Sequence, residues 1–173
     1  MSGPVFLTGL MGSGKTTVGQ LLARRLGWEW LDLDAALERR SGMKVAKIFE
    51  TKGEAAFRRL ESQELKRQAR AGRTVISCGG GAVLAPENRR VLKGALTIYL
   101  AASPATLAKR LQGAQARPRP LLQGRGALQA LQALQRERAH FYRACARFVL
   151  RAADPPSTVA GRAYQRVRST LTP

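Results

Sequence analysis

The sequence is short of acidic residues, aromatic residues and cysteine, and these shortages limit what the protein can be. The 173 residues include only 11 acidic side chains but 30 basic ones, which gives a net charge of +19. A charge of this size attracts polyanions, but only 6% of the residues are aromatic. There is also no basic tail and no RNA-binding aromatic signature. Nucleic acid is therefore not the expected partner.

The two cysteines, Cys78 and Cys145, lie in apolar contexts and have neither metal-ligand nor disulfide-framework spacing. We expect both to be small core residues of a cytoplasmic protein. Long apolar runs are absent too: residues 97–102 form the longest, far shorter than the roughly 20 residues that cross a bilayer. The N-terminus enters a strand pattern without a charged-then-apolar leader. We expect no membrane segment, and a single monomeric domain over residues 1–173.

The order of predicted elements is typical of an α/β protein. The pattern predicts strands at residues 4–8, 30–33, 74–78, 96–100 and 147–151. It predicts helices at 16–26, 34–40, 45–50, 54–70, 86–93, 127–144 and 158–170, with a further helix starting at 103–104. This alternation favours a three-layer α/β/α fold with a five-stranded parallel sheet, whose ligands bind beyond the carboxyl ends of the strands. Glycines, prolines and arginines between residues 112 and 126 predict a mobile lid.

The strongest motif lies between the first predicted strand and helix and reads Gly-Leu-Met-Gly-Ser-Gly-Lys-Thr from Gly9 to Thr16. It matches a P-loop, in which backbone N–H groups face phosphate oxygens. Lys15 is then expected to reach the β- and γ-phosphates, and the Thr16 hydroxyl to hold Mg²⁺. The expected nucleotide contacts are Gly12, Ser13, Gly14, Lys15, Thr16 and Thr17. An Asn-Lys-x-Asp guanine motif is absent, and the 74–78 strand ends in glycines rather than an acid, so a small kinase is favoured over a GTPase or a large ATPase.

Two aspartates are expected beside the P-loop. Asp32 and Asp34 lie two residues apart at the end of the second predicted strand, which predicts that both point to the same face. Asp32 could then position the outer shell of Mg²⁺, while Asp34 could bind an acceptor hydroxyl and draw its proton. The alternative is that Asp34 caps a helix and Asp32 is merely solvated.

An ordered set of motifs across residues 5–160 resembles the shikimate kinase family. Its members in this sequence are Leu31-Asp-Leu-Asp34, Ile48-Phe49, Gly53-Glu54, Phe57-Arg-Arg-Leu-Glu61, Cys78-Gly-Gly-Gly-Ala82, Arg119-Pro-Leu-Leu122, and Arg138 with Tyr142. The resemblance implies transfer of the ATP γ-phosphate to the 3-hydroxyl of shikimate, with one Mg²⁺, on the route to aromatic amino acids. It also places the substrate-binding helices at about residues 34–70.

The resemblance implies a role for each motif residue. Arg58 and Arg138 would bind the carboxylate, since guanidinium groups bind carboxylates bidentately. Asp34 would take the hydroxyls, and the bare backbone of Gly79, Gly80 and Gly81 would let the ring approach. The nucleotide side would use Arg119 in the lid, Arg110 on the adenine, and Pro155 or Pro156 at its edge. Transfer would be direct and in line, without a covalent intermediate.

Some points stay open at the level of sequence. Arg117 and Arg119 both precede a proline and compete for the lid role, and the two leucines that follow favour Arg119. Arg151 occupies a position where the family usually has an acid. A kinase for another hydroxy acid, such as gluconate, could share this fold. A basic regulatory or nucleic-acid-binding protein could also keep a P-loop for sensing, and turnover would distinguish it from an enzyme.

Overall fold

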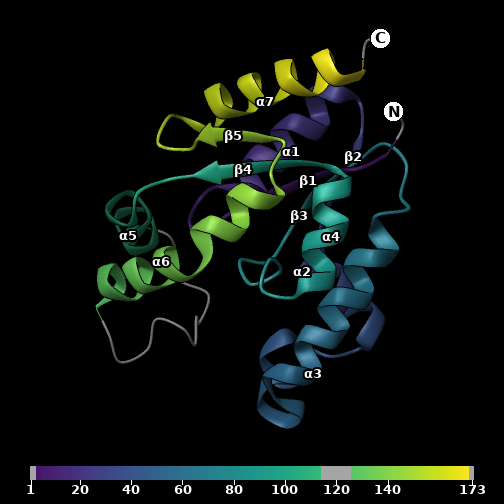
Figure 1. The fold of residues 1–173 in the computed structure, drawn as a ribbon, viewed down its shortest axis with the longest axis vertical. Helices are drawn as coiled ribbons and strands as arrows, with labels where there is room; N and C mark the ends of the chain where they lie inside the picture. Colours follow the sequence, from purple (N-terminus) through teal and green to yellow (C-terminus); the bar gives the residue numbers. More distant parts are fainter. Residues whose placement is uncertain (1–2, 114–125, 172–173) are drawn as a thin grey trace.

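The computed structural model describes residues 3–113 and 126–171. A five-stranded sheet forms its centre (Figure 1). Its strands are β1 (Val5–Thr8), β2 (Glu29–Asp32), β3 (Thr74–Ser77), β4 (Leu96–Ala101) and β5 (Phe148–Arg151). They pair in the order β2-β3-β1-β4-β5, and every pair is parallel. The predicted α/β fold with a five-stranded parallel sheet is confirmed.

The helices connect successive strands, as parallel pairing requires. They are α1 (Lys15–Leu26), α2 (Leu33–Ser41), α3 (Val45–Gln68), α4 (Pro86–Gly94), α5 (Pro104–Gly113), α6 (Ala127–Cys145) and α7 (Pro156–Leu171). Within α3, Gly53 has φ 76° and ψ 172°, which breaks the helix between the two segments predicted at 45–50 and 54–70. Across residues 3–113 and 126–171, no helix combines the length and apolar character needed to cross a bilayer.

Two apolar cores lie on opposite faces of the sheet because successive side chains of a strand point to opposite sides. Val5 and Leu7 of β1 pack with α1 and α7, whereas Phe6 packs with α4 and α6. Figure 1 shows α1 and α7 above the sheet and α4 and α6 below it, with α3 reaching away at the bottom. Cys78 and Cys145 are free thiols in the lower core, as expected. All strands end at the same edge, where the P-loop and the predicted substrate residues gather.

The expectation that Asp32 and Asp34 share one face of a strand is wrong. β2 ends at Asp32, and Asp34 already lies in the first turn of α2. The capping alternative is wrong in its assignment as well, because Asp32 rather than Asp34 caps α2. The Asp32 Oδ1 accepts the Ala35 N–H at 3.1 Å. Since a strand and a helix differ in period, the alternation of side chains along a strand does not apply to Asp34.

Candidate active site

The P-loop forms the turn between β1 and α1. Gly9, Gly12 and Gly14 have φ values of 141°, 78° and 92°, which L-residues with a side chain rarely adopt. A methyl group added at Gly9 would also lie 2.7 Å from the Leu100 carbonyl oxygen. Gly14 is the N-cap of α1 and supplies no side-chain cap, so N–H groups of the first turn remain for a ligand. The loop therefore has the geometry of an anion site at a helix N-terminus.

Lys15 folds back over this loop. Its Nζ donates to the carbonyl oxygens of Gly9 at 2.8 Å and Leu10 at 3.0 Å. Thr16 and Thr17 follow it and are exposed, while Ser13 is only 1% exposed. The six predicted nucleotide contacts thus lie on one continuous turn and the start of α1. This arrangement keeps an ammonium group directly beside the amides that would face phosphate.

A hydrogen-bonded pair that sequence reasoning missed holds α1 against the sheet. Ser77 Oγ at the end of β3 donates to the Lys15 carbonyl at 3.0 Å, and Trp30 Nε1 donates to Ser77 Oγ at 3.1 Å. A methyl group at Gly19 would lie 2.7 Å from Trp30 Nε1, so only glycine lets α1 come this close. The one signal in the sequence was Gly19 inside a predicted helix. Glycine is about 1 kcal/mol less favourable than alanine there, so its presence indicates close packing.

The predicted substrate residues come together around the glycine triplet that follows β3. A methyl group at Gly79 would lie 3.0 Å from Asp34 Oδ1, and one at Gly81 would lie 2.6 Å from Arg58 Cζ. From the other side, the Gly80 carbonyl accepts hydrogen bonds from the Tyr142 hydroxyl and, at 3.3 Å, from Arg138 Nη1. Side chains of α2, α3 and α6 therefore meet at one stretch of bare backbone.

Glu61 is a second residue to which sequence reasoning gave no role. It is 1% exposed and accepts a hydrogen bond from Arg58 Nη1 at 2.8 Å. The Arg58 Nη2 meanwhile bonds Glu54 at 3.0 Å, so two carboxylates hold this guanidinium. The signal was the spacing: Glu61 follows Arg58 by three residues and so lies on the same helix face.

This pocket keeps polar atoms buried without partners. Among the described residues, Asp34 Oδ1, Glu61 Oε1 and Arg138 Nε are buried and have no hydrogen-bond partner. Buried polar groups are normally satisfied, because an unmade hydrogen bond costs about 1–3 kcal/mol. The two open carboxylate oxygens can accept hydrogen bonds from ligand hydroxyls, and the open guanidinium nitrogen can donate to a ligand carboxylate.

Burial raises the pKa of the carboxyl groups in this pocket. The pKa of Asp34 rises from 3.8 to about 6, because burial disfavours its charged form and Asp32 and Glu61 repel it; Lys15 and Arg58 act in the opposite direction. Burial likewise raises the pKa of Glu61, against the attraction of Arg58. A carboxyl whose pKa lies near 6 is mostly ionised at neutral pH and can still accept a proton readily, which suits a general base.

Arg110 connects the two sides of the nucleotide region. From α5 its Nη1 donates to the Gly12 carbonyl at 3.4 Å, and its Nη2 donates to the Ala153 carbonyl at 3.3 Å. It therefore lies between the P-loop and the segment that follows β5. Pro155, in that segment, is exposed and immediately precedes α7. Arg119 and most of the predicted lid lie outside the described residues.

The residues proposed for Mg²⁺ fit an ion that comes with a nucleotide. Within residues 3–113 and 126–171, no group of three or more His, Cys, Asp or Glu side chains could form a metal site by itself. Mg²⁺ in kinases takes most of its ligands from phosphate and water, so it needs few from the protein. The exposed Thr16 at the start of α1 and the partly buried Asp32, whose charge reaches Asp34, supply donors of the right chemistry.

Comparison with known proteins agrees with this geometry. The family model for shikimate kinase matches residues 11–168. The chain belongs to the shikimate kinase family. Shikimate kinase 2 of Dickeya chrysanthemi is 41% identical over 170 residues, which cover 97% of this chain and 98% of that protein.

A solved shikimate kinase from Acinetobacter baumannii, in complex with shikimate, matches with a TM-score of 0.91 and 32% identity over 100% of this chain and 97% of that one. A gluconokinase from Sinorhizobium meliloti reaches a TM-score of 0.56 at 18% identity over 98% of each chain, which shows a common fold alone. The resemblance found in the sequence is therefore confirmed, and the gluconate-type alternative gains no support beyond the fold.

Proposed function

We propose that the protein transfers the γ-phosphoryl group of ATP to the 3-hydroxyl of shikimate, releasing ADP and shikimate 3-phosphate on the route to aromatic amino acids. One observation carries the proposal. Asp34, Arg58 and Arg138 converge on the glycine triplet beside the P-loop, and Asp34 Oδ1 and Arg138 Nε are buried there without hydrogen-bond partners among the described residues. The A. baumannii relative, solved with shikimate, supports the choice of acceptor.

On the donor side, the P-loop amides and Lys15 bind the phosphates, and Arg110 with Pro155 holds the adenine. Lys15 exchanges its bonds to the Gly9 and Leu10 carbonyls for bonds to phosphate oxygens. The Thr16 hydroxyl would hold Mg²⁺ and Asp32 would position its outer shell, and the bound ion would neutralise phosphate charge. Arg119, in the predicted lid, closes over the site, offsets charge on the transferring group and excludes water.

On the acceptor side, Arg58 and Arg138 bind the shikimate carboxylate. Glu61 and the Gly80 carbonyl hold these two guanidinium groups in place before substrate arrives. Asp34 accepts a hydrogen bond from the attacking hydroxyl and takes its proton as the phosphoryl group transfers. The new P–O bond forms at the acceptor oxygen while the bond from the γ-phosphorus to the bridging oxygen breaks, and ADP leaves with that oxygen.

The experiment is a coupled assay of ADP release with Mg-ATP and shikimate, run beside gluconate and no-acceptor controls. We expect shikimate-dependent release, and Lys15→Met abolishes it because the β- and γ-phosphates lose their cation. Lys66→Met, which removes an exposed lysine from α3, leaves the rate near that of the parent. ADP release that is equally fast with gluconate, or that needs no acceptor, contradicts the proposal. We also propose that the enzyme acts as a monomer, so the rate per molecule should be the same at every protein concentration.

A further inference from the structure

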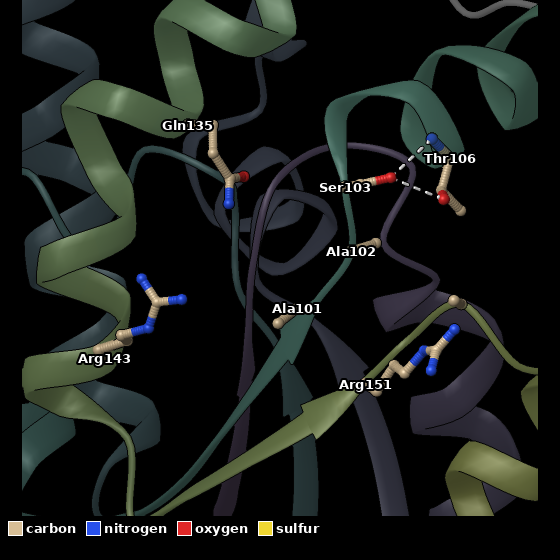
Figure 2. Close-up of a pocket in the computed structure, with 8 residues that line it drawn as sticks. Ala101, Ala102, Ser103, Thr106, Gln135, Arg143 and Arg151 are labelled. Carbon is tan, nitrogen blue, oxygen red and sulfur yellow. Dashed lines mark hydrogen bonds between the residues drawn. The ribbon is translucent and has the colours of Figure 1, made fainter.

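A hollow of about 310 Å³ lies at the β5 edge of the sheet (Figure 2). It adjoins the nucleotide region, because Ala153, whose carbonyl accepts a hydrogen bond from Arg110, is one of its lining residues. Alanines at the end of β4 form its floor, and its polar walls come from Ser103, Thr106, Gln135, Arg143 and Arg151. No residue of the P-loop or the glycine triplet lines it. Nothing in the proposed phosphoryl transfer uses these side chains.

Two arginines bring positive charge to this hollow from different elements. Arg143 comes from α6 and Arg151 from the end of β5, and Figure 2 shows them on opposite sides of the β4 and β5 ends. Across the described residues, neither forms an ion pair with a carboxylate. The acids nearest in sequence are engaged elsewhere: Asp154 pairs with Arg162 at 2.6 Å, and Glu137 lies 3.6 Å from Arg138 Nε. Two like charges around one concavity repel unless an anion separates them.

The start of α5 adds donors and a favourable dipole at the same place. Ser103 Oγ accepts the Thr106 N–H at 3.2 Å, and the two hydroxyls lie 2.9 Å apart. Ser103 already caps the Thr106 N–H and Pro104 has no N–H, so α5 contributes its hydroxyls and the macrodipole, which attracts anions. The hollow thus combines two guanidinium groups, two hydroxyls and a helix N-terminus.

Gln135 supplies an open acceptor between these donors. Its carboxamide points from α6 into the space beside β4, as Figure 2 shows, and its side chain hydrogen-bonds Tyr99. Its Oε1 is buried and has no hydrogen-bond partner among the residues that the structure describes. An acceptor left open in this position can take an O–H or N–H group from a ligand or from water.

We propose that this hollow is a second ligand site, which binds a small molecule through a phosphate group. Arg143 and Arg151 bind the phosphate oxygens, and the dipole at the start of α5 favours the negative charge of the phosphate. Gln135 accepts a hydrogen bond from a hydroxyl of the ligand. A phosphate dianion fits better than a single carboxylate, because its three terminal oxygens can use donors on several walls at once. Its walls include no P-loop residue and neither Arg110 nor Pro155, so the site should stay available when the nucleotide is bound.

The test is a calorimetric titration of the full-length protein saturated with ADP, so that phosphate binding at the P-loop is blocked. The probes are inorganic phosphate and glycerol 3-phosphate, which distinguish a free ion from a phosphomonoester. We expect saturable binding of one equivalent of at least one probe. Arg143→Gln and Arg151→Gln each weaken it about tenfold or more, as expected when a charged hydrogen bond is lost.

The matched control is Arg147→Gln. Arg147 lies between these two arginines in the sequence and is also exposed, but it does not line the hollow. If Arg143 and Arg151 bind the phosphate directly, the Arg147→Gln variant should bind the probe with the same affinity as the parent. All three arginines are exposed, so the melting temperatures of the variants should match the parent and exclude a folding defect. Absence of saturable binding of both probes overturns the proposal. An equal loss in Arg147→Gln also overturns it, because attraction would then follow net charge alone.

Discussion

Replacing Asp34 by asparagine tests the electrostatics of the acceptor pocket, because two opposite effects are expected from one substitution. The change keeps the shape of the side chain and removes its charge. In the folded protein the pKa of Asp34 rises from 3.8 to about 6, mainly through burial. One pKa unit corresponds to about 1.4 kcal/mol, so ionised Asp34 destabilises the fold by up to about 3 kcal/mol above pH 6.

The sign follows from the direction of the pKa change. Because the folded state holds the proton more tightly than the unfolded chain, stability is highest at low pH and is lost as the pH rises from about 4 to about 6. The carboxamide of asparagine cannot ionise, so the Asp34→Asn variant avoids this loss. It should therefore be more stable than the parent by up to about 3 kcal/mol near pH 7.5, and by only about 1 kcal/mol near pH 4.5.

The assay is urea unfolding of both proteins, without ligands, at these two pH values. A gain of about 3 kcal/mol corresponds to a melting temperature raised by roughly 6–12 °C for a protein of this size. Glu50→Gln serves as control: Glu50 is exposed, so its loss should change stability by less than about 0.5 kcal/mol. The activity of Asp34→Asn should fall at least about 100-fold, since the proton acceptor is gone. A variant that is less stable near pH 7.5, or whose gain does not change with pH, refutes the reasoning.

Three further outcomes are expected of the same pocket. In the parent protein, kcat/KM for shikimate should fall as the pH drops through about 6, because protonated Asp34 cannot take a proton; a flat profile down to about pH 5 would contradict this. Arg58→Ala should raise KM for shikimate about 30-fold or more with the KM for ATP unchanged, whereas Arg59→Ala, its exposed neighbour, should alter neither. Equal losses for both substrates would argue against carboxylate binding. Gly81→Ala should lower kcat/KM about tenfold, since its methyl group would displace the Arg58 guanidinium; Gly94→Ala, which meets nothing within 4 Å, should remain near the parent value.

The fold could be predicted from the sequence because local pattern and tertiary structure agree. Strands buried on both faces appear as short apolar runs, so the predicted strand at residues 74–78 differs from β3 by one residue. Gly53 separated two predicted helices, and the structure has non-helical backbone at that residue. The P-loop was recognised because its chemistry depends on spacing along the chain, which a sequence displays directly.

The acceptor pocket was only partly predictable, for a physical reason. The family resemblance drew attention to Asp34, Arg58 and the glycine triplet, and the structure brings them together. Their partners come from distant segments: Tyr142 reaches Gly80 across 62 residues of chain, and no local pattern encodes such a contact. The expectation that Asp32 and Asp34 point to the same face was wrong because it applied strand alternation to Asp34, which the helix predicted at 34–40 already includes and which lies in the first turn of α2.

The position of β1 in the sheet has a consequence for synthesis. This strand precedes all the others along the chain, yet both of its neighbours, β3 and β4, follow much later in the sequence. At about 5–20 residues per second, a ribosome needs roughly 5–20 seconds to pass from the P-loop to β4. During that interval both edges of the apolar strand β1 lack hydrogen-bond partners, and the P-loop that follows it cannot adopt its folded geometry. Nascent chains of this protein should therefore gain affinity for ATP late and abruptly, and a translational pause before β4 would lengthen their exposure to aggregation.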